Sequence, residues 1–195
     1  MRRLAILIPA AGASTRMRGT DKLLQEVRGQ PLLRDRVALA LATGCDVAVT
    51  MPPDATARRA ALDGLNVTLL PVPDAATGLS ASLRAGAAWA MAQEAAALMV
   101  LLPDLPDLTA PDLQTLLQAN DFETIFRACD TTGAPGHPVI LPARLLPDLS
   151  HVTGDTGARD LLRTHSVTPV ALPDQHATTD LDTPEAWAAW RAAQT

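Results

Sequence analysis

Short apolar runs alternate along the chain with longer segments in which apolar residues recur at helical spacing. The short runs predict strands, and their nearly continuous apolar character is typical of strands buried on both faces of a parallel sheet. The predicted strands are Leu4–Ile8, Val47–Met51, Val67–Pro71, Leu98–Leu102, Thr124–Ala128, Val139–Leu141 and Val167–Leu172. The predicted helices lie between them, at residues 31–43, 55–62, 80–92, 111–118, 155–164 and 184–193.

This alternation predicts a Rossmann-like α/β fold with a mostly parallel sheet. The fully apolar run Leu98–Leu102 is expected in the centre of that sheet. No repeat or linker divides the chain, so we expect residues 1–195 to form one domain. Ligands of such sheets bind at the carboxyl ends of the strands, so polar residues that directly follow a strand are the candidate site residues.

The first predicted strand leads into a loop of small residues that is followed by three cations. In order these residues are Ala10, Ala11, Gly12, Ala13, Ser14, Thr15, Arg16, Arg18 and Lys22. Small side chains let a polyanion approach backbone N–H groups, and nearby cations neutralise its charge, so the loop predicts a nucleotide triphosphate site. The chain has no GxGxxG after this strand and no GxxxxGK[ST], which argues against a dinucleotide fingerprint and a P-loop. Taken alone, the loop is also compatible with a plain strand-to-helix turn that carries surface arginines.

The loop resembles the signature AAGxSxRMGxxK of the MobA-like nucleotidyltransferases, a group that includes molybdenum cofactor cytidylyltransferases and guanylyltransferases. The matching residues are Ala10, Ala11, Gly12, Ser14, Arg16, Met17, Gly19 and Lys22. Arg18 is inserted where the family has Met and Gly adjacent. The resemblance implies a three-layer nucleotidyltransferase fold in which the loop backbone from Ala10 to Ser14 binds the nucleotide. It also implies that Arg16 and Lys22 are the catalytic cations at the triphosphate.

Two acidic segments supply candidate metal ligands. Asp104 directly follows the central apolar run, where a carboxylate can coordinate Mg²⁺. Its segment resembles the family motif GDMP or GDQP, although Pro103 replaces the glycine; a turn-capping aspartate is the alternative. Residues 179–185 resemble the motif DIDTPED, which implies a second ligand that we assign to Asp182 in preference to Asp180.

A fourth region, which has two parts, resembles motifs of the cytidylyltransferase branch. Residues 136–139 match GHPV and residues 154–159 match GDxGAR, which implies acceptor contacts by His137, Asp155 and Arg159. The alternatives are a hydrogen-bonded structural histidine and, for Asp155, a helix N-cap.

A fifth segment, residues 78–86, resembles G(M/L)xxSLRAG and implies nucleotide contacts by Gly78 and Ser82. Helix capping by Ser80 and core packing by Leu83 explain much of this segment without a ligand.

The five resemblances together imply a Mg²⁺-dependent nucleotidyltransferase that transfers CMP from CTP to molybdenum-molybdopterin and releases pyrophosphate. The AAG form of the loop, with GHPV and GDxGAR, favours CTP, and a guanylyltransferase that uses GTP is the alternative. Because Arg18 and Pro103 depart from the family pattern, a non-catalytic nucleotide-binding module in molybdoenzyme maturation also stays open. In each case a molybdoenzyme or its chaperone is an expected partner.

Composition agrees with this class of protein. The chain is 48% apolar and 19% charged with a net charge of −5, which argues against nucleic acid or an anionic membrane as its main partner. No apolar run approaches the roughly 18 residues of a membrane span. Cys45 and Cys129 are far apart and form no CxxC, and no signal peptide is evident, so we expect reduced thiols and a cytoplasmic location.

Overall fold

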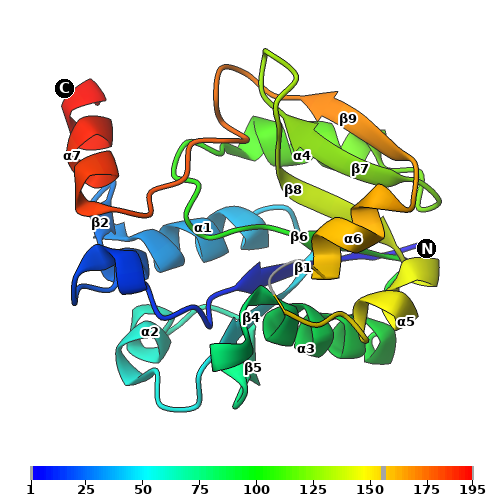
Figure 1. Cartoon of the computed structure of the whole chain (residues 1–195), viewed down its shortest axis with the longest axis horizontal. Coiled ribbons are helices and arrows are strands. Elements are labelled where there is room, and N and C mark those ends of the chain that lie inside the picture. Colours follow the sequence, from blue (N-terminus) through cyan, green and yellow to red (C-terminus); the bar gives the residue numbers. More distant parts are fainter. Residues whose placement is uncertain (1, 155–156, 195) are drawn as a thin grey trace.

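A seven-stranded sheet forms the centre of the computed structural model, which describes residues 2–154 and 157–194 (Figure 1). The strand order is β5-β4-β1-β6-β8-β7-β9, so β6 is the middle strand, as its apolar run predicts. The strands are β1 Leu4–Pro9, β4 Asp46–Met51, β5 Thr68–Pro71, β6 Ala97–Val100, β7 Ile125–Cys129, β8 Pro135–Pro142 and β9 Val167–Ala171. The predicted three-layer α/β fold is confirmed.

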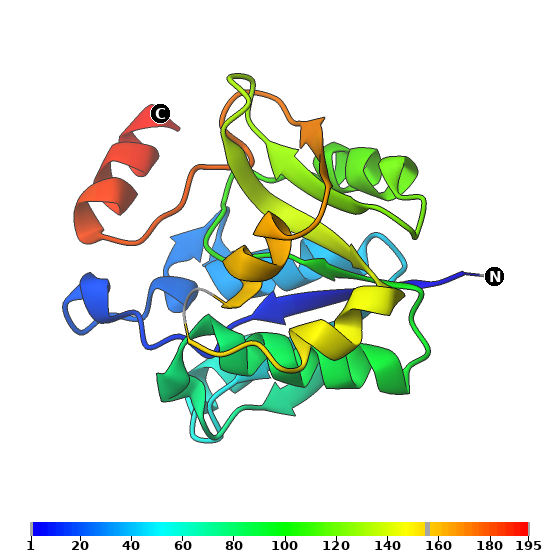
Figure 2. The same ribbon diagram turned by 45° about the vertical axis from the view of Figure 1, so that its right-hand side comes forward.

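Helices cover both faces of this sheet (Figures 1 and 2). They are α1 Leu32–Leu41, α2 Thr56–Ala61, α3 Leu79–Ala92, α4 Ala110–Ala119, α5 Leu146–Leu149, α6 Gly157–Arg163 and α7 Pro184–Ala193. Ile6 and Ile8 of β1 pack in one core cluster with α1, α4 and α7, whereas Ala5 and Leu7 pack in the other with α3 and α5. This alternation is the two-residue period of a strand buried on both faces. Within the described residues, no helix has the length and apolar character needed to cross a membrane.

One strand runs against the others. β8 pairs antiparallel with both β6 and β7, while the pairs β1–β4, β1–β6, β4–β5 and β7–β9 are parallel. The turn between β7 and β8 explains this, because Asp130 Oδ1 accepts hydrogen bonds from the backbone N–H groups of Thr132 and Ala134 at 2.8 and 3.0 Å. A turn this short can join only antiparallel strands, since a parallel connection needs a crossover.

Two small elements lie outside the predicted pattern. Residues 26–31 form a hairpin of β2 Glu26–Val27 and β3 Gln30–Pro31, and α5 is a single turn. Helices α4 and α7 begin within one residue of their predicted starts: Asp112 accepts from the backbone N–H of Thr109 at 2.8 Å, and Thr183 Oγ1 accepts from the Ala186 N–H at 3.2 Å. These caps satisfy amide groups that have no partner in the first helical turn.

Backbone hydrogen bonds bring distant segments together at the carboxyl ends of β1 and β6. The Ala10 N–H donates to the Thr50 carbonyl at 2.9 Å, which fixes the start of the small-residue loop. The Leu181 N–H donates to the Asp104 carbonyl at 3.1 Å, which holds the acidic segment near the C-terminus against the loop after β6. The two acidic segments of the sequence therefore meet at one edge of the sheet, as predicted for ligand sites.

Candidate active site

A cavity of about 570 Å³ lies at the carboxyl ends of β1 and β6. The predicted site residues that line it are Gly12, Arg16, Lys22, Gly78, Asp104, His137 and Asp182. They come from segments spread between residues 12 and 182, so the fold gathers side chains that are far apart in the sequence. A pocket of this volume is within the range that holds a small-molecule ligand.

Lys22 is the central cation of the cavity and the only lysine in the chain. Its Nζ donates to Asp104 Oδ2 at 2.6 Å and to Asp182 Oδ1 at 2.5 Å. Its side chain is 17% exposed. Burial lowers the pKa of Lys22, but the charges and hydrogen bonds of the two carboxylates outweigh it, so the pKa lies above its usual value and the ammonium stays charged.

The C-terminal acidic pair is asymmetric. Asp182 Oδ2 also accepts from Arg16 Nη2 at 2.6 Å, whereas Asp180 is more exposed. Burial raises the pKa of Asp182, but Lys22 and Arg16 more than offset this and hold the pKa below its usual value. Burial and the hydrogen bond to Asp182 raise the pKa of Asp180. Asp182 is therefore the carboxylate that meets the cations, and its role as a metal ligand stays a prediction.

One oxygen in this cluster has no hydrogen bond. Asp104 Oδ1 is buried and accepts none from the described residues, although Oδ2 of the same carboxylate binds Lys22. Across the described part of the chain, no group of three or more His, Cys, Asp or Glu side chains is arranged to hold a metal ion. A cation at Asp104 would satisfy the orphaned oxygen, because a buried carboxylate oxygen without a donor is costly.

A buried arginine that sequence reasoning missed holds the small-residue loop. Arg58 on α2 donates from Nη1 to the Ala10 carbonyl at 2.6 Å and binds both oxygens of Asp21, from Nε at 2.6 Å and from Nη2 at 2.9 Å. Its Nη2 lies 3.4 Å from Ser14 Oγ, and Ser14 has a left-handed backbone with φ of 51°. The same loop borders a second cavity of about 490 Å³ through Ala11, Gly12 and Ala13. Arg58 thus links both ends of the loop.

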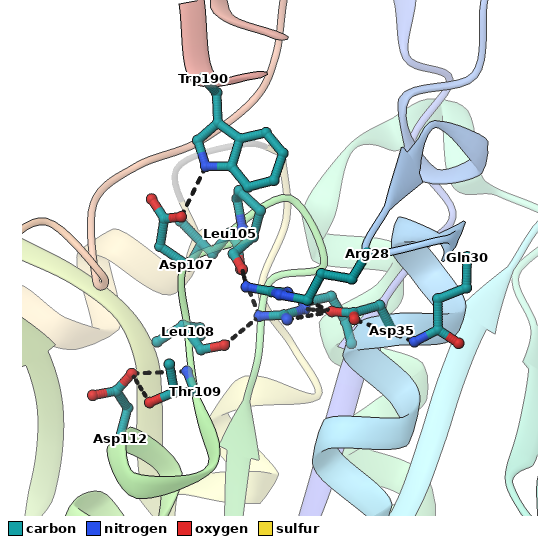
Figure 3. A network of polar contacts seen from close by, with 11 residues as sticks. Arg28, Gln30, Asp35, Leu105, Asp107, Leu108, Thr109, Asp112 and Trp190 are labelled. Atoms are coloured by element: carbon teal, nitrogen blue, oxygen red, sulfur yellow. Dashed lines mark hydrogen bonds and ion pairs between the residues drawn. The ribbon is translucent and has the colours of Figure 1, made fainter. Parts of the chain in front are cut away.

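A second buried network supports the loop that follows Asp104 (Figure 3). Arg36 on α1 is 2% exposed, pairs with Asp35 and donates to the carbonyls of Leu105 at 2.9 Å and Leu108 at 2.7 Å. Arg28 of the hairpin also reaches Asp35, at 3.2 Å. On the other side of the loop, Trp190 Nε1 of α7 donates to Asp107 Oδ1 at 2.8 Å. These contacts fix the backbone of the loop from three elements.

His137 stands at the far side of the cavity, at the start of β8. The backbone N–H of His137 donates to the Ala177 carbonyl at 3.0 Å. The neighbouring Gly136 must be glycine, because a Cβ at this position would lie 2.0 Å from the same carbonyl oxygen. The ring Nδ1 is buried without a hydrogen bond to a described residue. Burial, with the charge of Arg127 as a second cause, lowers the pKa of His137 to about 4, so the ring is neutral at pH 7.

The remaining predicted residues lie elsewhere. Ser82 is 2% exposed inside α3, on a face that packs into the core, and does not line the cavity, so its nucleotide contact stays a prediction that the cavity lining does not support. Arg159 lines two smaller cavities next to the main one. Asp155 lies outside the described residues. Ala10 is fully buried, and the Ser14 hydroxyl is engaged by Asp21 and Arg58, so these two positions can offer a ligand only backbone groups.

Comparison with known proteins now gives the family. A domain model described as a MobA-like NTP transferase domain matches residues 6–170. The chain belongs to the MobA-like NTP transferase domain family. The family of nucleotidyltransferases predicted from the sequence motifs is therefore confirmed, and the cavity described above lies within the matched domain and the C-terminal segment that follows it.

Individual relatives cover nearly the whole MobA-like chain. Nicotine blue oxidoreductase from Paenarthrobacter nicotinovorans is 31% identical over 188 residues, which is 90% of each protein. The crystal structure of Rv0371c from Mycobacterium tuberculosis H37Rv superposes with a TM-score of 0.81 at 26% identity, covering 100% of this chain and 99% of that one. A manganese complex of Rv0371c matches at 23% identity with a TM-score of 0.79, covering 96% and 97% of the two chains, and this likeness shows the fold alone.

Proposed function

We propose that this MobA-like protein transfers CMP from CTP to the phosphate of a molybdopterin-type acceptor and releases pyrophosphate. One observation carries the transferase part of the proposal: the cations Lys22 and Arg16 meet the carboxylates Asp104 and Asp182 in a single cavity at the carboxyl edge of the sheet. A triphosphate requires cations, and a metal ion that accompanies it requires carboxylates. This cavity contains both.

The chemistry needs little from the protein beyond position and charge. An oxygen of the acceptor phosphate attacks the α-phosphorus, a new P–O bond forms, and the bond to the bridging oxygen of the leaving pyrophosphate breaks with its electron pair on that oxygen. A phosphate oxygen carries no proton that must be removed at neutral pH, so no general base is required. Lys22 and Arg16 hold the triphosphate and stabilise the charge that develops in the transition state.

The donor set fits a hard divalent cation. The orphaned Oδ1 of Asp104 and the nearby carboxylate of Asp182 are the residues that would hold it. When bound, Mg²⁺ would supply Lewis-acid neutralisation of phosphate oxygens. The ammonium of Lys22 binds Asp104 Oδ2 and Asp182 Oδ1, so an ion that also took these two oxygens would compete with Lys22 and could displace it. Its flexible four-carbon stem allows this, and the freed ammonium can then meet a phosphate.

The choice of base rests on the AAG form of the loop and on the segments around His137 and Arg159, which resemble the cytidylyltransferase branch. A structural neighbour described as a CMP-2-keto-3-deoxy-manno-octonic acid synthetase in complex with CTP, at 16% identity and a TM-score of 0.75 over 98% of each chain, shows the fold alone. GTP use and non-catalytic nucleotide binding are therefore outcomes of the test.

The test is a thermal shift series with CTP, GTP, ATP and UTP, each with and without Mg²⁺, followed by pyrophosphate release in the presence of acceptor. We expect a Mg²⁺-dependent shift that is selective for CTP. A shift selective for GTP would transfer the proposal to the guanylyltransferases, and binding without pyrophosphate release would favour a non-catalytic module. No shift with any nucleotide would contradict nucleotide binding at this cavity.

The name of one relative, nicotine blue oxidoreductase, favours a second candidate, an oxidoreductase that acts on the dye nicotine blue. In the described residues, neither cysteine lines the main cavity, so a redox reaction there would depend on a bound redox cofactor. Oxidation of a reduced nicotinamide nucleotide by the protein in the presence of such a dye, followed at the absorbance of the reduced nucleotide, separates the two candidates. Dye-dependent oxidation without pyrophosphate release would favour the oxidoreductase.

A further inference from the structure

The C-terminal helix α7 carries one side of the acidic cluster. Asp182 directly precedes Thr183, the N-cap residue of α7, so the place of its carboxylate depends on where the helix begins and how it is oriented. In Figures 1 and 2, α7 stands at the margin of the molecule, at the end of a long segment that follows β9. The family match ends at residue 170 and covers neither Asp182 nor α7. The contacts that hold this helix therefore determine whether Asp182 meets Lys22.

Two attachments hold the start of this helix. Leu181 is buried, and its backbone N–H donates to the Asp104 carbonyl at 3.1 Å. Trp187 is also buried and packs into the core cluster that contains α1 and α4. Both attachments lie before or within the first helical turn, whereas α7 has 10 residues and is therefore about 15 Å long. A helix that is fixed only at its first turn can tilt about that turn.

Trp190 supplies an attachment further along the helix. Its Nε1 donates to Asp107 Oδ1 at 2.8 Å (Figure 3). Its ring meets the ring of Trp187 edge-on, with centroids 6.1 Å apart and planes at 77°, so the two indoles share one face of α7. The acceptor is a carboxylate and both partners are partly buried, which makes this bond stronger than a neutral bond in solvent. A further ion pair of α7, Arg18–Glu185, is exposed on both sides and contributes less.

Asp107 belongs to the same loop that presents Asp104. Buried Arg36 donates to two carbonyls of this loop, so its backbone is a fixed support. Trp190 attaches α7 to that support, on the residue three positions after Asp104. One loop thus presents the first carboxylate of the cluster and, through Asp107, holds the helix that begins next to the second.

We propose that Trp190 is a positioning residue of the candidate active site. Its hydrogen bond to Asp107 sets the orientation of α7, and this orientation holds Asp182 beside Lys22. Without the bond, α7 tilts about its first turn, and the two predicted metal ligands, Asp104 and Asp182, are no longer held at a fixed separation. This role rests on the proposed function, because it concerns the carboxylates that would hold the metal ion there. Trp190 touches no substrate and acts through Asp182.

The single lysine of the chain gives a readout that requires neither nucleotide nor metal. Protein labelled with ¹³C at lysine Cε shows one lysine signal in the NMR spectrum, from Lys22, and this signal depends on the charges around the ammonium. Trp190→Phe keeps an aromatic ring against Trp187 and removes the N–H donor. We expect it to move the signal in the direction in which Asp182→Asn moves it. Trp89→Phe changes a partly buried indole of α3 in the other core cluster, so this matched control should leave the signal in place.

Two variants of Asp107 separate positioning from a general loss of stability. Asp107→Asn keeps an oxygen that accepts from the indole and should retain the wild-type signal, whereas Asp107→Ala should shift it as Trp190→Phe does. The double variant Trp190→Phe/Asp107→Ala should show no larger shift than either single variant, because the same bond is lost in each. If Trp190→Phe and Asp107→Ala both melt as folded proteins and both keep the wild-type Lys22 signal, the proposal is overturned.

A titration with Mn²⁺ in the presence of CTP connects this role to the metal ion. A paramagnetic ion beside Lys22 broadens its signal, and the Mn²⁺ concentration at half-broadening gives an apparent affinity. We expect Trp190→Phe to require about fivefold more Mn²⁺ than wild type, the scale of one hydrogen bond. Equal requirements in the two proteins would also overturn the proposal. If Mn²⁺ and CTP leave the wild-type signal sharp, the metal site of the proposed function fails, and the ligand-free spectra still decide on Trp190.

Discussion

The two sides of the main cavity differ in how their charges are balanced. On the nucleotide side, the cations are paired with carboxylates: the pairs are Lys22–Asp104, Lys22–Asp182, Arg16–Asp182 and Arg58–Asp21. On the side formed by β7, β8 and α6, Arg127 and Arg159 have no carboxylate partner among the described residues. The protein thus neutralises its own charge where it would bind a triphosphate and leaves positive charge uncompensated where it would bind the acceptor.

This difference predicts two modes of anion binding. Two of the three ammonium donors of Lys22 bind carboxylates, and a metal ion that takes over these carboxylates would free Lys22 for a phosphate, so nucleotide and metal ion should bind interdependently at Lys22. An unpaired arginine needs no such exchange, and anion binding at Arg127 should be independent of metal. Arg58 and Arg36 belong to neither mode, because their ion pairs hold backbone loops in place.

The largest effect is expected on the free energy of unfolding, from loss of the buried Arg36 network that holds the loop after Asp104. Arg36→Met leaves the carboxylate of Asp35 buried and removes the donors of two loop carbonyls, so the free energy of unfolding should fall by about 3–5 kcal/mol. Arg28→Met is the comparison, because Arg28 contacts the same carboxylate and the single loop carbonyl of Pro106 from an exposed position, so its loss should cost only about 1 kcal/mol. Urea denaturation measures both, and equal losses would contradict the special role of Arg36.

Lys22→Met should reduce turnover by on the order of 10²-fold or more, because the transition state loses its central cation. Arg18→Ala in the same loop is the control. Arg18 pairs with the exposed Glu185, so its loss should change turnover little. Steady-state pyrophosphate release compares the two, and a Lys22→Met enzyme of nearly normal activity would show that the paired side is not the site of catalysis.

Asp104→Asn should abolish the Mg²⁺ dependence of nucleotide binding, because the neutral amide keeps the shape of the side chain and removes the charge that would hold the ion. The thermal shift by CTP with and without Mg²⁺ is the measurement, with melting of the nucleotide-free protein as the control for folding. A variant whose CTP shift still increases with Mg²⁺ would place the metal elsewhere.

Arg58→Gln should weaken CTP binding by about tenfold, because the small-residue loop loses a buried ion pair and its link to the Ala10 carbonyl. The adjacent Arg59 is exposed on the same helix, and Arg59→Gln should bind CTP normally. Calorimetric titration gives the affinities. If both variants bind like wild type, Arg58 does not position the loop for nucleotide.

The smallest effect concerns His137 and pH. Because its pKa is lowered to about 4 in the folded protein, the unfolded chain takes up the proton first, and stability is lost as the pH falls from about 6.5 towards 4. Between pH 7 and 5.5 this should amount to about 1 kcal/mol, a loss that His137→Asn removes. Urea denaturation at the two pH values tests this, with exposed His151→Asn as the control. An unchanged pH dependence in His137→Asn would contradict a buried neutral ring.

The sequence predicted most strands well because they are apolar runs, and the carboxyl-edge rule selected Asp104. Asp182, which lines the same cavity as Lys22 and Asp104, was expected there only from the family resemblance. The sequence did not predict the direction of each strand, because the spacing of apolar residues is the same in parallel and antiparallel strands. The antiparallel direction of β8 follows from the short turn around Asp130. Arg58 was missed because nothing in the run from Thr56 to Ala61 separates it from Arg59. Only the tertiary position of α2 buries one of these arginines and exposes the other.

The most direct measurement follows the single lysine of the chain. Protein labelled with ¹³C at lysine Cε gives one lysine signal in the NMR spectrum, from Lys22. If Lys22 exchanges its two carboxylates for phosphate, CTP and Mg²⁺ added together should move this signal well beyond the sum of the shifts that each causes alone. A signal that stays in place at saturating CTP and Mg²⁺ would contradict a nucleotide site built on Lys22.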